Sequence, residues 1–167
     1  MPRLSVAAVW SGPSIESVHW TQDSAVAALV SKLAARRTTL SDAEQLIDGF
    51  AQNQGPGKKE KLTALFAGLF ETLNDERTQV IDGLLRFSAK QKELAAKIRA
   101  ERAAAQEKPP QTPQHPGKTE GAPVQELDWD LRIFDERQRS LSFVCESPVL
   151  IEQRLFALAR AIERNLD

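Results

Sequence analysis

Tyrosine is absent from the 167 residues, and aromatic side chains make up only 6% of the chain. Aromatic and β-branched residues favour strands, so this scarcity argues against an extended sheet and favours helices. Cysteine occurs once, at Cys145, which excludes an internal disulfide framework. No second Cys and no nearby His completes a zinc-binding spacing around it. We therefore expect a mainly helical protein without disulfides or metals.

Long apolar runs are also missing. No run approaches the ~20 residues that a membrane-spanning helix needs. The first thirteen residues contain a single Arg, an interrupted apolar stretch and no clear cleavage site, so they do not resemble a signal peptide. We expect a protein that is neither secreted nor inserted into a membrane, and a cytoplasmic location.

Motifs that carry catalysis are lacking as well. The sequence has no phosphate-binding loop, dinucleotide-binding glycine pattern, metalloprotease helix or nucleophile elbow, and its glycine cluster Gly55-Pro56-Gly57 lies between expected helices. His19 and His115 have no partner residues nearby that would support general-base or metal chemistry. The acidic residues at 128, 130, 135 and 136 are typical of a solvated edge. The sequence therefore predicts no enzyme activity, no cofactor and no metal.

Apolar periodicity predicts two helices in the first part of the chain. The first should begin at Thr21 or Asp23 and run to about Arg37, with Val26, Leu29, Val30 and Leu33 on its buried face. Ser41 and Glu44 form a capping box that predicts the start of the second, whose buried stripe is Leu46, Ile47 and Phe50. Alternation between residues 3 and 20, with a turn at 11–14, favours a short β-hairpin.

The segment 58–106 repeats apolar residues at steps of three and four from Leu62 to Ile98. A single helix of this length would extend about 74 Å at ~1.5 Å per residue. Two preceding helices of about four turns each cannot cover such a seam. Either the helix is one rod that finds a partner, or it folds into an antiparallel hairpin near residue 74, where Asn74 and Asp75 offer a new cap and Gly83 is a weak point.

Five prolines fall within residues 107–124, where no apolar period offers burial, and we expect a disordered linker there. Beyond it, two alternating apolar runs predict a β-hairpin with a four-residue connection. Its strands carry Trp129, Leu131 and Ile133, then Leu141, Phe143 and Cys145. Ser147-Pro148 predicts the start of a last helix with the stripe Ile151, Leu155, Leu158, Ile162 and Leu166.

The expected fold is thus mainly α, a helical bundle with one long coiled-coil-like or hairpin helix. Three regions follow along the chain: a helical module at 1–106, a Pro-rich linker at 107–124 and a small ββα unit at 125–167. The formal net charge is −1 overall, but about +3 for residues 58–106 and −3 for 107–167.

The composition and pattern favour a non-enzymatic adaptor, assembly or chaperone-like protein that binds a protein partner, or a second copy of itself, through the long helix. The residues expected to make this contact are Leu84, Phe87, Leu94 and Ile98. An anionic partner could contact Arg86, Lys90, Lys97, Arg99 and Arg102. The alternative is a DNA-binding regulator that uses residues 42–70 as a helix-turn-helix, and an enzyme with a site scattered in sequence ranks below it.

Overall fold

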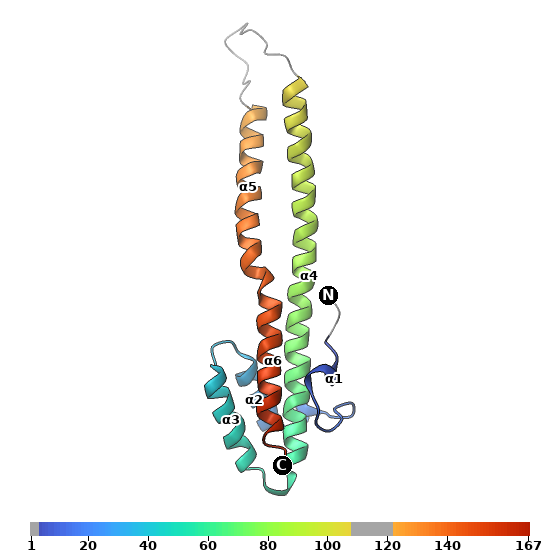
Figure 1. Cartoon of the computed structure of the whole chain (residues 1–167), viewed down its shortest axis with the longest axis vertical. Coiled ribbons are helices and arrows are strands. Elements are labelled where there is room, and N and C mark those ends of the chain that lie inside the picture. Colours follow the sequence, from blue (N-terminus) through green and yellow to red (C-terminus); the bar gives the residue numbers. More distant parts are fainter. Residues whose placement is uncertain (1–3, 108–121) are drawn as a thin grey trace. The chain divides into compact units, whose positions relative to one another are not determined.

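The computed structural model describes residues 4–107 and 122–167, which form helices joined by short loops (Figure 1). Contacts divide the chain into two compact units. The first, which we call the core unit, combines the chain up to Ile81 with the final segment Ser147–Asp167. The second, the hairpin unit, is Asp82–Glu146. The long helix α4, Lys58–Glu107, contributes to both.

The core unit contains three helices of substantial length besides the first part of α4. These are α2 (Ser24–Ala34), α3 (Leu40–Gln52) and α6 (Ser147–Glu163). Shorter turns of helix complete it: α1 (Val6–Val9), η1 (Trp20–Gln22) and η2 (Gly55–Gly57). Helix α6 packs against α3 and α1, so the end of the sequence completes a core begun at its start.

Local capping explains where the N-terminal helices begin. The Asp23 side chain accepts hydrogen bonds from the backbone amides of Ala25 and Val26, at 3.0 and 3.1 Å, which confirms the predicted start of α2. That helix ends at Ala34, earlier than Arg37. The predicted Ser41–Glu44 capping box is wrong: Thr39 caps α3, because its extended backbone places its hydroxyl 3.1 Å from the amide of Asp42.

The core surrounds the first part of α4. From Leu62 to Leu69 every side chain except Ala64 is buried. Helices α2, α3 and α6 supply the facing residues, among which Val26, Val30, Leu33, Ile47, Leu155, Leu158 and Ile162 are almost completely buried. The predicted stripes of α2 and α6 are therefore largely confirmed.

The predicted hairpin at residues 3–20 is wrong, since the described part of this segment contains one turn of α-helix and no strand. Apolar residues of this segment pack against the helices of the core unit instead of forming a sheet. The ring of Trp10 stacks on Phe66 of α4 with centroids 4.1 Å apart, and its indole nitrogen donates to the carbonyl of Pro13. The segment thus wraps over α4, which buries an aromatic ring without requiring a strand partner.

Helix α4 continues without a break through residues 74 and 83, so the hairpin predicted to fold near residue 74 is wrong and the rod is right. Asn74 does not cap a new helix: its carbonyl accepts a hydrogen bond from the Thr78 hydroxyl within α4. One turn away, the buried Arg77 pairs with Glu152 of α6. The hydrogen bond within α4 and the ion pair with α6 stabilise residues 74–78 as part of a continuous helix.

The predicted ββα unit is also wrong. Residues 125–145 belong to one helix, α5 (Ala122–Cys145), and only the last helix of that prediction is present, as α6. The short alternating runs were interpreted as strands, although the same segment also has the four- and three-residue spacing of a helix. The residues with this spacing are Leu127, Leu131, Phe134, Gln138 and Leu141. Cys145, which that prediction assigned to a strand, is the last residue of α5 and is exposed. The linker expectation falls largely on residues 108–121, which lie outside the described part of the chain.

Candidate interaction surface of the helical hairpin

Within the hairpin unit, residues 82–107 of α4 lie beside α5 in antiparallel orientation (Figure 1). The Gln91 side chain donates to the carbonyl of Phe134 at 3.2 Å, and further along α4 Lys97 reaches Glu126, which precedes Phe134 in α5. Higher residue numbers in α4 thus meet lower ones in α5. Residues 82–107 of α4 and helix α5 therefore run in opposite directions within this unit.

The four predicted contact residues Leu84, Phe87, Leu94 and Ile98 all lie on the part of α4 that belongs to this unit. They continue a stripe of mainly three- and four-residue steps that starts at Leu62 and includes Gln91. Ile98 and Gln91 are buried, whereas the other three keep part of their surface exposed. Whether a partner contacts this seam stays a prediction.

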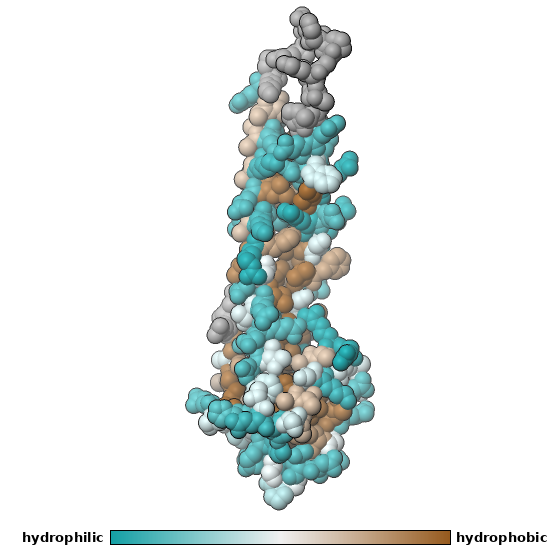
Figure 2. Space-filling view, turned by 180° about the vertical axis from the view of Figure 1, so that it is seen from behind, coloured by the Kyte–Doolittle hydropathy of each residue, from teal (hydrophilic) through white to brown (hydrophobic). Residues whose placement is uncertain are grey.

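Large apolar side chains are more exposed elsewhere on the hairpin unit. On α4 this is Leu85, and on α5 they are Trp129, Phe143 and Val144. Phe143 is 78% exposed and Trp129 is 64% exposed. The two aromatic residues are 14 positions apart, which is two heptads, so they share one face of α5. Figure 2 shows apolar surface exposed between hydrophilic side chains on the side of the molecule that it presents.

Lys97 contacts three carboxylates in the hairpin unit. Its ammonium lies 2.9 Å from Glu126, 2.8 Å from Asp130 and 3.4 Å from Glu101 of its own helix. Hydrogen bonding to Asp130, followed by that to Glu126, raises the pKa of Lys97, so it stays charged at neutral pH. Carboxylate oxygens of these three acids lie within 4.8 Å of one another, a spacing that could hold a cation. The lysine already supplies the positive charge, so this cluster is better explained as a fixed contact between the helices.

The other basic residues proposed to contact an anionic partner are Arg86, Lys90, Arg99 and Arg102, and each is exposed on α4. They are spread along 17 residues of helix. Lys97 is the member of the set for which the structure shows carboxylate partners on α5. The helix therefore keeps a positive surface, while Lys97 pairs with acidic residues of α5.

Residues 42–70, the segment of the DNA-binding alternative, form α3, the Gly55–Gly57 turn and the start of α4. A recognition helix must expose one face to the major groove. Here almost all side chains from Leu62 to Leu69 are buried, and the nearby Lys61 pairs with Asp23 at 2.5 Å. This arrangement offers little surface for reading bases.

Comparisons with known proteins give no relative: no family model, no curated protein and no solved structure matches the chain. Among the helices that the structure describes, none combines the length and apolarity required to cross a bilayer.

Sequence reasoning missed the exposed face of α5 because it assigned these residues to strands. Trp129 and Phe143 were then expected on the apolar side of a small sheet. The heptad positions of the apolar residues could have revealed this face. If Leu127, Leu131 and Phe134 face α4, the two aromatic residues must point away from it. A helical interpretation of residues 122–145 would have exposed this conflict.

Proposed function

We propose that the chain is a non-enzymatic protein of the adaptor, assembly or chaperone-like kind, which binds another protein chain through its hairpin unit. The partner is a helix of a different protein or of a second copy. The single observation that carries this proposal is the pair of exposed aromatic residues Trp129 and Phe143 on one face of α5.

The energetics support a binding role for this face. Burial of apolar surface contributes about 25 cal/mol per Å², and aromatic side chains dominate the energy of many protein interfaces. Placing such side chains two heptads apart gives a helical partner two anchor points separated by about 21 Å along α5. The partly exposed seam residues Leu84, Phe87 and Leu94 add apolar surface on α4 of the same unit.

The structure of the hairpin unit also suits such a role. Two helices cannot enclose a core by themselves, so a third or fourth helix is the usual completion of this arrangement. The ion pairs of Lys97 with Glu126 and Asp130 join the second part of α4 to the first turns of α5. A hairpin fixed in this way can offer its outer face without first refolding, which lowers the entropic cost of binding.

A photo-crosslinking experiment tests the proposal. Benzoylphenylalanine is placed at position 143 of the full chain in the cells that make it, and irradiation is expected to give a covalent adduct with another polypeptide. The matched control places the same group at Glu60, an exposed position of α4 in the core unit. The adduct at 143 should disappear when Trp129 is changed to Gln, since one anchor is then lost.

Mass spectrometry of the adduct identifies the partner as a second copy or a different protein, and both results agree with the proposal. The Trp129→Gln chain is checked by circular dichroism, and because this side chain is mostly exposed we expect an unchanged helical spectrum. If irradiation gives no adduct at 143, or equal adducts at 143 and 60, this face is not a binding surface and the proposed function is wrong.

A further inference from the structure

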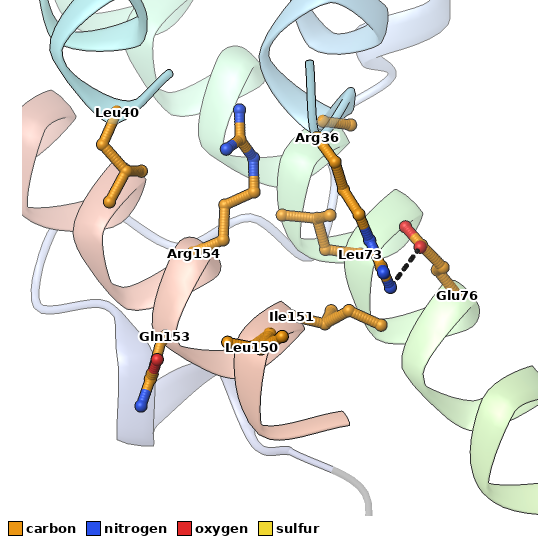
Figure 3. A pocket seen from close by; sticks show the side chains of 9 residues that line it. Arg36, Leu40, Leu73, Glu76, Leu150, Ile151, Gln153 and Arg154 are labelled. Carbon is orange, nitrogen blue, oxygen red and sulfur yellow. Dashed lines mark hydrogen bonds and ion pairs between the residues drawn. The ribbon is translucent and has the colours of Figure 1, made fainter. Parts of the chain in front are cut away.

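The core unit has a pocket of about 220 Å³, and all of its lining residues belong to that unit (Figure 3). Its walls come from three places: the loop between α2 and α3, one turn of α4 and the first turns of α6. The apolar lining is Ala34, Leu40, Leu73, Leu150 and Ile151. Engineered apolar cavities of about 150 Å³ bind benzene, so this volume suits one large apolar side chain.

Exposed apolar side chains gather at this pocket. In the core unit the large hydrophobic residues with substantial exposure are Leu40, Val149 and Leu150, within the part of the chain that the structure describes. Leu40 and Leu150 line the pocket, and Val149 precedes Leu150 in α6. The rest of the unit hides its large apolar groups well. A concave site where they stay exposed is typical of a binding pocket.

Charge around the pocket is positive. Its lining includes the guanidinium groups of Arg36 and Arg154 but only one carboxylate, that of Glu76. Arg36 is more than half exposed and contacts Glu76 at 3.4 Å, the pair drawn in Figure 3. A pair this long and exposed contributes little to stability, so Arg36 can turn towards a new carboxylate at small cost.

Arg154 is held in place by the backbone. Its Nε and Nη2 donate to the carbonyl of Leu33, and Nη2 also donates to the carbonyls of Ala35 and Thr38, at 2.6 to 3.1 Å in all. These bonds tie α6 to the end of α2 and fix one wall of the pocket. Burial lowers the pKa of this guanidinium, yet an arginine remains charged at neutral pH. The pocket therefore combines a fixed cation with a mobile one.

We propose that this pocket is a second docking site, which takes one large apolar side chain of a partner peptide that carries carboxylates next to that side chain. The apolar group would fill the space between Leu73, Ile151 and Leu150. The neighbouring carboxylates would meet Arg36 and the positive field of Arg154. The proposal concerns the core unit and does not depend on the function proposed for the hairpin unit.

Two peptides that differ only in charge test the site. The probes are a 14-residue amphipathic helix of Leu and Glu, and the same sequence with Lys in place of every Glu. Binding to the full chain is followed by NMR of labelled Leu and Ile methyl groups. The Glu peptide is expected to shift the methyl signals of Leu40, Leu73, Leu150 and Ile151, with an affinity about tenfold above that of the Lys peptide.

Two variants and a control locate the binding. Leu150→Gln should abolish these shifts, and Arg36→Gln should bring the affinities of the two peptides close together. Both residues are exposed, so the fold should survive, as circular dichroism can verify. Val144→Gln removes a similarly exposed apolar residue from the hairpin unit and should leave the peptide affinity unchanged.

Three outcomes would overturn the proposal: equal affinity for both peptides, shifts confined to other methyl groups, or full binding by Leu150→Gln. A fourth is a shift of the same pocket methyl groups when the chain alone is concentrated, which would mean that a second copy occupies the pocket. None of these outcomes touches the crosslinking result at position 143, so the two proposals fail separately.

Discussion

The core unit and the hairpin unit use the same helix in two different ways. In the first part of α4 nearly every side chain from Leu62 to Leu69 is buried, because α2, α3 and α6 supply apolar partners. In the second part the heptad stripe continues with the same spacing, but α5 is the helix of its unit that packs against it, and Leu84, Phe87 and Leu94 keep exposed surface. The same spacing of apolar residues along α4 is therefore buried in the core unit and only partly buried in the hairpin unit.

The largest effect is expected when charge is introduced into the seam between α4 and α5, which tests whether the two units unfold separately. Changing Leu94 and Ile98 together to Asp should separate α4 from α5, because carboxylates placed in this apolar seam lose hydration without gaining partners. Hydrogen exchange is expected to become fast from about residue 85 to 105 and across α5, while amides of α2, α3 and α6 stay protected. Loss of protection in the core unit as well would mean that the two units fold as one cooperative structure.

A pair of aromatic truncations measures how complete each core is. Phe66→Ala removes a fully buried ring stacked on Trp10 and should lower the free energy of unfolding by about 3–5 kcal/mol. Phe87→Ala, in the seam of the hairpin unit, should cost less than half of that because the ring is only partly buried. Urea denaturation of the two variants supplies the comparison. Equal costs would show that the hairpin seam is a closed core.

The same substitution, Gly to Ala, at two positions of α4 compares the packing around this helix in the two units. A Cβ at Gly68 would lie 2.6 Å from Val30 and 2.8 Å from the Trp20 ring, so Gly68→Ala should destabilise by about 1–3 kcal/mol. At Gly83, in the hairpin unit, the nearest atom is the end of Arg86 at 4.0 Å, and Gly83→Ala should stabilise the helix by about 0.5–1 kcal/mol. Thermal denaturation by circular dichroism should show shifts of opposite sign.

The smallest expected effect concerns the cap of α2 in the core unit. The hydrogen bond from Lys61, followed by that from the Val26 amide, lowers the pKa of Asp23 below its ordinary 3.8. Its contribution is therefore complete above about pH 5 and is lost as the pH falls through the lowered value. A titration of the Val26 amide signal should show this step, and Asp23→Asn should remove it. A step above pH 5 would contradict the assignment.

The sequence predicted elements well where capping and period agree. Asp23 marked the start of α2, and the stripe of α6 followed from Ile151, Leu155 and Ile162. The apolar period of α4 was also recognised as helical, although α5 was not recognised as the helix that packs against its second part. Local signals suffice here because each one acts within a few residues of the backbone it stabilises.

Prediction failed where a short pattern fitted two structures. Trp129-Asp130-Leu131 alternates over a few residues, yet the same residues fit a helix once the steps from Leu127 to Leu141 are considered. Arg154 and Leu40 gave no signal at all, because the pocket they share joins segments more than a hundred residues apart. Only tertiary contact brings such residues together, and no local rule contains it.

The return of α6 to the core unit constrains how the chain can fold. Residues 82–146 separate the core part of α4 from α6, so the core stays incomplete until α6 has been synthesised. Searching for that contact with a flexible loop of this length would be slow, since closure entropy must be lost first. A hairpin of local contacts can form early and shorten the effective loop to a few residues. The Lys97 ion pairs would then act on folding speed, by keeping the two arms together while α6 finds its place.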